Sequence, residues 1–297
     1  MEATVEPVDR IEGQLVVPGD KSISHRGLIL AAMASGTSTI RGCPPGRDVA
    51  STASSLRRLG VEVDSAGPGG VGERAGPGGV RELAVRGTGW EVVPEATLDA
   101  GNSATTMRLL AGALAGRPGS FRFVGDESLS KRPMDRIADP LRRMGALVEL
   151  SQGRYPPIRV TGASLTGISY RLPVASAQVK GAILLAGLQA QGATCVLEEP
   201  ASRDHTERML AWLGAPVEVT PGRVMLEGHG LLPLPAFELD VPGDFSSAAF
   251  WIVAASLVSG SDLHLVGVGL NPTRTGLLEI LASMGAAIEL EKAAGGP

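Results

Sequence analysis

Four stretches of the chain share one order of apolar and polar positions. They are LRRLGVEV from position 56, LRRMGALVEL from 141, LAWLGAPVEV from 210 and LASMGAAIEL from 281. Each has the pattern of an amphipathic helix end, a glycine in the left-handed region, and a short strand of Val, Ile or Leu. The four glycines are spaced 85, 69 and 71 residues apart. The sequence therefore predicts α/β repeat units, each with about two helices and three or four strands.

The tetrapeptide VPGD occurs twice, at Val17–Asp20 and Val241–Asp244. Each copy follows a strand-like run and precedes a helical pattern that opens at a serine. Proline and glycine at matching points predict two equivalent crossings of a domain boundary. We expect an N-terminal lobe at residues 20–240 with three repeat units. Residues 1–19 plus 241–297 are expected to form a partial second lobe with one unit.

The composition argues against several classes of function. With 43% hydrophobic residues, the 297-residue chain has enough apolar surface for a core, which excludes overall disorder. Aromatic residues are 3% of the chain, which argues against stacking on single-stranded nucleic acid. The net charge of −4 gives no general attraction to a polyanion, so an anion site has to be local.

Cysteine usage and the apolar runs indicate the compartment. Cys43 and Cys195 have no CxxC partner or accompanying histidine, so neither a disulfide framework nor a zinc site is predicted. No signal pattern opens the chain, and the longest apolar run, 248–258, is far shorter than the ~20 residues that span a bilayer. We expect a cytoplasmic protein with no membrane partner. The duplicated Gly/Pro stretch at 66–83 is interpreted as a surface loop.

The densest polar cluster is PGDKSISHR, residues 18–26. Lys21, Ser22 and Arg26 gather at the start of a predicted helix. Free backbone N–H groups, the positive end of the helix dipole and two cationic side chains favour an anion site there. The alternative interpretation is ordinary helix capping by Ser22 or Ser24. The spacing GxxxxGK[ST] is absent, so nucleotide hydrolysis gains no support.

Two further clusters follow along the chain. LDAGNSATTMR, residues 98–108, offers small residues where backbone can approach a ligand, with Arg108 one turn into a helix. A buried helix start capped by threonine is the alternative. GDESLSKRPM, residues 125–134, places Arg132 before a proline predicted to open a helix. Arg132 is a candidate for bidentate contact with phosphate or carboxylate, and a solvated turn is the alternative.

The fourth cluster is VASAQVKGAILLAGL, residues 174–188. Ser176 and Gln178 stand at a helix start, where Ser176 as a simple N-cap is the alternative interpretation. Lys180 is one of only four lysines in the chain, and its simplest interpretation is a solvent-facing side chain.

The fifth cluster, SRDHTERML from position 202, precedes a repeat helix. In the alternative interpretation, Asp204 or Thr206 is simply a helix cap, and His205 lacks metal-ligand spacing to another histidine. All five clusters stand at helix starts, each in its own repeat or at a junction. If the repeats pack side by side, these starts converge and form a broad site for a substrate with several negative charges.

These motifs, with VPGDFSSAAF and NPTRTG, occur in the order expected for the 5-enolpyruvylshikimate-3-phosphate synthase family, and the resemblance spans residues 18–276. It implies a two-domain, inside-out α/β barrel of six βαβαββ-type units, with the second domain truncated here. It also implies transfer of the enolpyruvyl group from phosphoenolpyruvate to the 5-hydroxyl of shikimate 3-phosphate, releasing phosphate, in aromatic amino-acid biosynthesis. A monomer without metal or organic cofactor is expected.

The resemblance also implies site residues. It assigns shikimate 3-phosphate to Lys21, Ser22, Arg26, Ser176, Ala177, Gln178, Ser202 and Arg203. It assigns phosphoenolpyruvate to Lys21, Asn102, Ala104, Arg132 and Gln178. Lys21, which faces both substrates in this assignment, is the expected catalytic residue.

The chain departs from the family in its later motifs. The D-E-[YF]-P segment, the K-E-S-D-R segment and a further His-Arg motif are absent, which leaves the acid–base residues unassigned. A non-catalytic fragment that binds shikimate 3-phosphate is therefore the alternative function. The sister transferase acting on UDP-N-acetylglucosamine would carry a reactive loop cysteine, and neither Cys43 nor Cys195 lies in such a motif.

Ala104 is a second departure. The family motif commonly reads GN-[SA]-G-T, whereas this chain reads GNSATT. By resemblance, that position lies against phosphoenolpyruvate and against the longer inhibitor glyphosate. A methyl group there predicts glyphosate tolerance by steric exclusion, unless the backbone shifts to absorb it.

Overall fold

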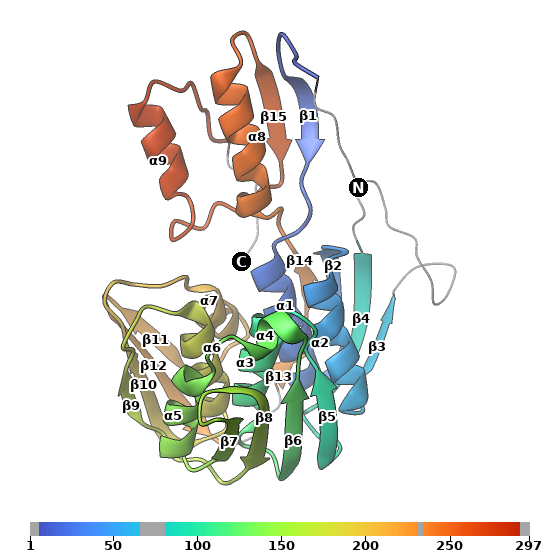
Figure 1. The fold of residues 1–297 in the computed structure, drawn as a ribbon, viewed down its shortest axis with the longest axis vertical. Helices are drawn as coiled ribbons and strands as arrows, with labels where there is room; N and C mark the ends of the chain where they lie inside the picture. The colour runs from blue at the N-terminus through green and yellow to red at the C-terminus, as the bar shows by residue number, and fades with distance from the viewer. Residues whose placement is uncertain (1–5, 66–80, 231–233, 292–297) are drawn as a thin grey trace.

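The computed structural model describes residues 6–65, 81–230 and 234–291. Three sheets surround a set of central helices in one group of elements, and a smaller group with two strands and two helices lies above them (Figure 1). We refer to these as the lower group and the upper group. The expected lobe limits at residues 20 and 240 remain a prediction.

Two units of the lower group repeat one order of elements. The first of these comprises β5 (Glu95–Asp99), α3 (Ala104–Leu114), β6 (Gly119–Val124), the short α4 (Glu127–Ser130), α5 (Asp135–Arg143), β7 (Leu147–Ser151) and β8 (Tyr155–Gly162). The next comprises β9 (Ser169–Arg171), α6 (Ala177–Gly187), β10 (Gln191–Leu197), α7 (His205–Trp212), β11 (Val217–Thr220) and β12 (Arg223–His229). Their sheets have the matching orders β5-β6-β8-β7 and β9-β10-β12-β11, with the first pair parallel and the others antiparallel.

The remaining unit of the lower group takes its first strand from a distant part of the chain. It contains α1 (Lys21–Met33), β2 (Ala34–Cys43), α2 (Arg47–Arg58), β3 (Glu62–Ser65) and β4 (Arg81–Thr88). The position beside β2 is filled in parallel by β13 (Leu234–Pro235) and β14 (Glu238–Asp240). The chain thus returns to complete the sheet that it began about 200 residues earlier, as the register Thr39 to Glu238 shows.

The upper group has the corresponding exchange. It contains β1 (Glu12–Val16), α8 (Phe245–Leu257), β15 (Asp262–Val266) and α9 (Gly276–Ser283), with β1 parallel to β15. One VPGD segment leads from β1 into α1, and the other leads from β14 into α8. The two segments pair reciprocally, because Asp20 N donates to Pro242 O and Asp244 N donates to Pro18 O, both at 2.8 Å. The two crossings therefore lie side by side.

The core lies around α1, α3 and α6, which are buried along nearly their whole length after the first turn. A helix that is apolar all round belongs in a protein interior. Gly112 of α3 shows how closely these helices pack, since a Cβ atom there would lie 2.2 Å from Ala182 O of α6. Helices inside and sheets outside confirm the expected inside-out α/β arrangement (Figure 1).

The predicted glycine-ended helices are confirmed. Gly60, Gly145, Gly214 and Gly285 all have positive φ, between 81° and 113°, directly after α2, α5, α7 and α9. The strand predicted after the last of them is wrong, since residues 286–290 are not in a strand. The other three strands each pair with a strand that follows in the chain, and the described residues end at 291. Of the predicted 66–83 loop, residues 66–80 lie outside the described ranges, and 81–83 belong to β4.

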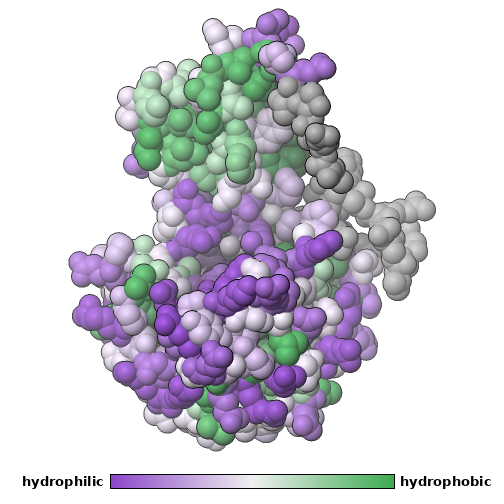
Figure 2. Space-filling model, in the orientation of Figure 1, coloured by the Kyte–Doolittle hydropathy of each residue, from purple (hydrophilic) through white to green (hydrophobic). Residues whose placement is uncertain are grey.

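The upper group carries an apolar surface. Phe250 and Leu257 of α8 are 80% and 78% exposed, and Met284 at the end of α9 is 75% exposed. Figure 2 shows this apolar region above a hydrophilic band that crosses the hollow between the two groups. Within the described ranges, no helix combines the length and the apolarity needed to cross a bilayer.

Candidate active site at the converging helix starts

The predicted convergence of helix starts is present, and Arg26 lies at its centre. Its Nη1 donates to Ser22 O at 2.9 Å, and its Nη2 donates across to Ala177 O of α6 at 3.3 Å. Its Nε donates to Thr206 Oγ1 of α7 at 2.7 Å. One guanidinium therefore holds the first turns of α1, α6 and α7 together. We call these starts, with that of α3, the helix-start cluster.

Gln178 connects α6 to α3. Its Nε2 donates to Thr105 Oγ1 at 2.8 Å, and its Oε1 accepts from Arg108 Nη1. Arg108 Nη2 also donates to Pro133 O at 3.1 Å. Ser176 is the N-cap of α6, with its Oγ accepting from Val179 N, as its alternative interpretation proposed. Gln178 is thereby held between two helices with its orientation fixed.

Arg132 lies against the residues that precede α3. Its Nη2 donates to Asn102 Oδ1 at 2.7 Å, while Asn102 Nδ2 donates to Asp126 Oδ2 at 2.7 Å. The hydrogen bond from Asn102 is the main cause that lowers the pKa of Asp126. Ala104, the first residue of α3, is 7% exposed. The structure therefore brings Arg132 and Asn102 together two residues from Ala104.

Positive charge is concentrated in this cluster. Burial lowers the pKa of Arg26 to about 10, and the charge of Arg203 acts in the same direction against Glu207. Burial also lowers the pKa of Arg108, helped by the charges of Arg136 and Arg132. A neighbouring anion would favour the charged form of each guanidinium. The arrangement is thus suited to bind a ligand with more than one negative charge.

Lys21 is the exposed cation of the cluster. Its ammonium pairs with Asp48 Oδ2 of α2 at 3.1 Å, and its side chain is 51% exposed. A surface pair of this kind is weak, contributing about 0–1 kcal/mol. The Lys21 ammonium can therefore exchange Asp48 for a ligand anion at low cost.

Comparison with known proteins decides the family. The family profile described as EPSP synthase (3-phosphoshikimate 1-carboxyvinyltransferase) matches residues 5–295. The chain belongs to the EPSP synthase family. A relative from Acidithiobacillus ferrooxidans, named 3-phosphoshikimate 1-carboxyvinyltransferase, is 50% identical over 96% of this chain and 63% of its own length. One of the same name from Bacillus subtilis is 44% identical over 97% of this chain and 65% of its own length.

Solved structures agree with this family. An EPSP synthase from Acinetobacter baumannii superposes with a TM-score of 0.84 at 44% identity, covering 96% of this chain and 62% of that chain. The chain spans less than two thirds of the length of these relatives.

In this EPSP synthase family member, the interpretation of Lys180 as a solvent-facing side chain is wrong. Lys180 does not face solvent, because α7 and the residues before it cover α6 on that side, and its side chain is 1% exposed. Its ammonium lies 2.5 Å from Glu198 Oε1 and 2.6 Å from Glu207 Oε1. Glu198 Oε2 accepts from Ser202 Oγ at 2.6 Å. The scarcity of lysine was the available signal, and here it marks a buried charge that holds Ser202.

Four capping assignments also need correction. Asp20, rather than Ser22 or Ser24, caps α1, and its Oδ1 accepts from Ile23 N at 3.0 Å. The second VPGD helix likewise starts after an aspartate, not at a serine. Ser103, rather than a threonine, caps α3. Asp204 precedes α7, but its side chain caps nothing.

Two other interpretations of these helix starts are also wrong. Thr206 binds Arg26 instead of capping α7. Pro133 does not open α5, which begins at Asp135. Across 6–65, 81–230 and 234–291, no three His, Cys, Asp or Glu side chains form a group that could hold a metal. Neither Arg108 nor Asp48 is among the site residues predicted from the sequence, yet both contact predicted site residues.

Proposed function

We propose that the helix-start cluster binds phosphoenolpyruvate and shikimate 3-phosphate for transfer of the enolpyruvyl group, with release of phosphate. The observation that carries the proposal is the guanidinium of Arg26, buried where α1, α6 and α7 meet. Family membership supports the identity of the substrates, because the curated relatives are named 3-phosphoshikimate 1-carboxyvinyltransferase.

The assignment of shikimate 3-phosphate follows the first turns of three helices. It comprises Lys21, Ser22, Arg26, Ser176, Ala177, Gln178, Ser202 and Arg203. Arg26 uses one N–H group on each of its three nitrogens for protein contacts. A guanidinium has five N–H groups, so two remain for a phosphate oxygen. The buried end of the site would thus offer donors that are already held in place.

The assignment of phosphoenolpyruvate uses the α3 side of the cluster. It comprises Lys21, Asn102, Ala104, Arg132 and Gln178. Arg132 shares Asn102 with Asp126, so its fork is oriented before a ligand arrives. A preorganised cation loses less side-chain entropy on binding than a free one. Gln178 lies between the two assigned regions and would contact both substrates.

The chemistry has two stages in the family mechanism. The 5-hydroxyl oxygen forms a bond to C2 of phosphoenolpyruvate, the hydroxyl loses its proton, and C3 gains one. The tetrahedral adduct then loses phosphate with a proton from C3, which restores the double bond. Oriented cations would stabilise the charges of the adduct, and Lys21 is the residue proposed to serve both substrates. The acid–base carboxylates remain unassigned.

Turnover and binding are separated by two measurements on the same preparation. Calorimetric titration measures binding of shikimate 3-phosphate, and a coupled assay measures phosphate release when both substrates are present. Because the family's D-E-[YF]-P and K-E-S-D-R motifs are absent from the 297 residues, we expect binding with little turnover. Rapid phosphate release would assign the acid–base steps to Asp or Glu residues of this chain. Absence of binding would contradict the proposed function.

Lys21→Ala is expected to weaken binding of shikimate 3-phosphate by about 1.5–3 kcal/mol, or about 10- to 150-fold in Kd, since a charged hydrogen bond is lost. Calorimetry measures the change. Arg86→Ala is the matched control, because Arg86 forms an exposed ion pair, with Glu62 at 3.2 Å, and neither residue belongs to the proposed site. Equal affinity in parent and folded Lys21→Ala would contradict the assignment.

Ala104→Gly is expected to increase glyphosate affinity by about 1–3 kcal/mol in the presence of shikimate 3-phosphate. Ala104 is almost fully buried at the start of α3, so its methyl group has little room to move aside. The longer inhibitor should lose more from that methyl group than phosphoenolpyruvate does. Titration of both ligands into parent and variant measures the difference. The same glyphosate affinity in both proteins would show that the backbone has absorbed the methyl group.

The monomeric state, the cytoplasmic location and the absence of nucleic-acid and membrane partners also remain predictions. The net charge of −4 supports the lack of a nucleic-acid partner.

A further inference from the structure

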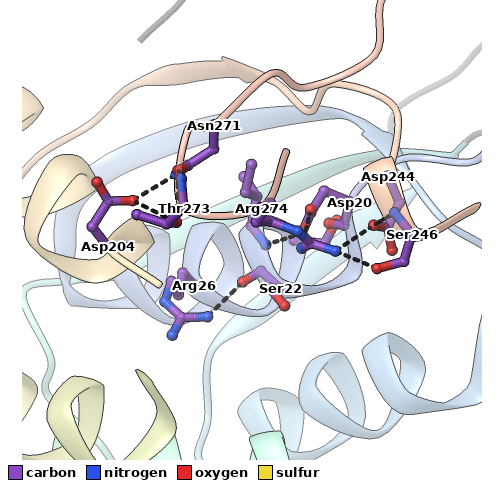
Figure 3. Close-up of polar contacts among 11 residues, drawn as sticks. Asp20, Ser22, Arg26, Asp204, Asp244, Ser246, Asn271, Thr273 and Arg274 are labelled. Atoms are coloured by element: carbon purple, nitrogen blue, oxygen red, sulfur yellow. Dashed lines mark hydrogen bonds and ion pairs between the residues drawn. The ribbon is translucent and has the colours of Figure 1, made fainter. Parts of the chain in front are cut away.

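Arg274 joins two carboxylates from opposite ends of the chain. Its Nη1 donates to Asp20 Oδ2 at 2.7 Å, and its Nη2 donates to Asp244 Oδ1 at 2.9 Å. Its Nη2 also donates to Ser246 Oγ at 2.5 Å, and 8% of the Arg274 side chain is exposed. Figure 3 shows the guanidinium reaching Asp20 on one side and Asp244 with Ser246 on the other. One arginine therefore bridges both VPGD segments.

Both aspartates also start helices. Asp20 Oδ1 accepts from Ile23 N in the first turn of α1, and Asp244 Oδ1 accepts from Ser246 N in the first turn of α8. Asp20 is followed directly by Lys21 and Ser22. The position of the Asp20 carboxylate consequently determines where the first turn of α1 presents these two residues.

The same segment reaches α7. Asn271 Nδ2 donates to Asp204 Oδ1 at 2.6 Å, and Thr273 Oγ1 lies 3.5 Å from that oxygen (Figure 3). Asp204 follows Arg203 in the chain. Residues 271–274 of the upper group thus contact the starts of two lower-group helices that carry proposed substrate residues.

The two VPGD segments are joined by only a short stretch of backbone pairing. Gly19 and Gly243 form an antiparallel bridge, flanked by the two reciprocal hydrogen bonds of the VPGD segments. A Cβ atom at Gly19 would lie 1.9 Å from Gly42 O of β2, so position 19 requires glycine. No side chain at Gly19 or Gly243 can brace the crossing. Among the described residues, the ion pairs that link its two halves are those of Arg274 with Asp20 and Asp244.

We propose that Arg274 is a positioning residue for substrate binding: it fixes the start of α1, with Lys21 and Ser22, relative to the upper group. The identity of the ligand rests on the proposed function. Removal of the guanidinium leaves Asp20 and Asp244 as neighbouring carboxylates without their shared cation, and these repel each other. A lysine restores the charge but lacks the planar fork that reaches both partners.

The test compares the full 297-residue chain with Arg274→Gln, Arg274→Lys and Arg41→Gln. Arg41 is the matched control, since it also bridges carboxylates, those of Glu82, Glu238 and Asp240, and is 40% exposed. None of these partners is a proposed substrate residue. Urea unfolding of each protein establishes that the native state is retained.

The first readout is amide hydrogen exchange at residues 20–24 and 244–248. In Arg274→Gln we expect exchange about tenfold faster at both helix starts, with α5 unchanged, because the effect is local opening. The second readout is the Kd of shikimate 3-phosphate. We expect it to rise about 5- to 150-fold, the usual range of coupling between sites, with partial recovery in Arg274→Lys. Arg41→Gln should change neither readout.

The two readouts separate this proposal from the proposed function. Unchanged exchange at residues 20–24 in Arg274→Gln overturns the positioning role even when the parent binds shikimate 3-phosphate. Faster exchange with an unchanged Kd overturns its importance for the substrate. If the parent binds no shikimate 3-phosphate, the proposed function fails, and the exchange data alone decide whether Arg274 fixes α1.

A second variant covers the case in which Arg274→Gln does not fold. Asp244→Asn keeps a good N-cap residue on α8 but removes one of the two charges that Arg274 bridges. It should change exchange at residues 20–24 and the Kd in the same directions, by smaller factors. If neither readout changes in Asp244→Asn, the proposal is overturned.

Discussion

Lys180→Met is expected to lower the free energy of unfolding by about 3–5 kcal/mol, the cost of removing one partner from a buried ion pair. The ammonium lies 2.5 Å from Glu198 Oε1 and 2.6 Å from Glu207 Oε1, with 1% of its side chain exposed. Methionine keeps much of the volume and removes the charge. Two buried carboxylates then face each other without a cation. Urea unfolding at pH 7 measures the loss.

Two further variants show whether burial is the cause. Lys131→Met removes an ammonium at the same 2.6 Å from a carboxylate, that of Glu127, where the lysine is 72% exposed. This control should cost less than about 1 kcal/mol. Combining Lys180→Met with Glu198→Gln and Glu207→Gln removes all three buried charges and should recover much of the stability. A loss in Lys180→Met no larger than in Lys131→Met would contradict the argument.

The Lys180 ion pairs also reach the proposed substrate site. Glu198 accepts a hydrogen bond from the hydroxyl of Ser202. Glu207 is the main opposite charge near Arg26, and it raises the pKa that burial of Arg26 lowers. Burial raises the pKa of Glu207, an effect that Lys180 opposes. The cation therefore favours the charged form of Glu207, which acts on Arg26. Stability and ligand affinity are expected to fall together in Lys180→Met.

Local patterns were sufficient to predict the repeats. A glycine after an apolar helix end has one favourable solution, the left-handed turn, and the chain adopts it at Gly60, Gly145, Gly214 and Gly285. The strand after a glycine depends on a partner as well as on its own residues. AAIEL has a strand-like composition, yet residues 286–290 form no ladder among the described residues. Propensity alone did not make that strand.

The clusters could be found from sequence, but the partners within them could not. In GDKSIS three residue types, Gly, Asp and Ser, suit an N-cap. Asp20 is the cap in the structure, where its Oδ1 accepts from Ile23 N and its Oδ2 accepts from Arg274. Arg274 follows Asp20 by 254 residues, so no periodicity relates them. The pairing of Lys180 with Glu198 and Glu207 likewise depends on how α7 packs on α6. These are tertiary contacts, and the sequence marked only their members.

Acid is expected to destabilise the protein through its buried histidines. Burial lowers the pKa of His25 to about 3, and the imidazole lies fully buried with Nδ1 at 2.7 Å from Thr52 Oγ1. Burial lowers the pKa of His205 to about 4. An unfolded histidine has a pKa of about 6.5. Below that pH the unfolded chain binds protons that the folded chain does not, so the free energy of unfolding falls as the pH falls.

His25→Asn isolates one of these contributions. An amide cannot titrate, and its donor or acceptor can replace Nδ1 beside Thr52. One pKa unit corresponds to about 1.4 kcal/mol. Between pH 6 and 4, the free energy of unfolding should therefore fall about 1.4 kcal/mol per pH unit more steeply in the parent than in the variant. At pH 4 the accumulated difference is about 3 kcal/mol. Urea unfolding at half-unit steps of pH measures both slopes.

Glu207 acts in the opposite direction, because its raised pKa stabilises the folded state as the pH falls. Since Glu207 is present in both proteins, its contribution cancels in the comparison. His264→Asn is the control, because His264 is exposed on β15 and meets water before and after unfolding. Its slope should equal that of the parent. Parallel slopes in the parent and His25→Asn would show that the His25 imidazole takes up its proton within the folded protein. The contact between α1 and α2 through His25 and Thr52 would then be open to water at pH 5.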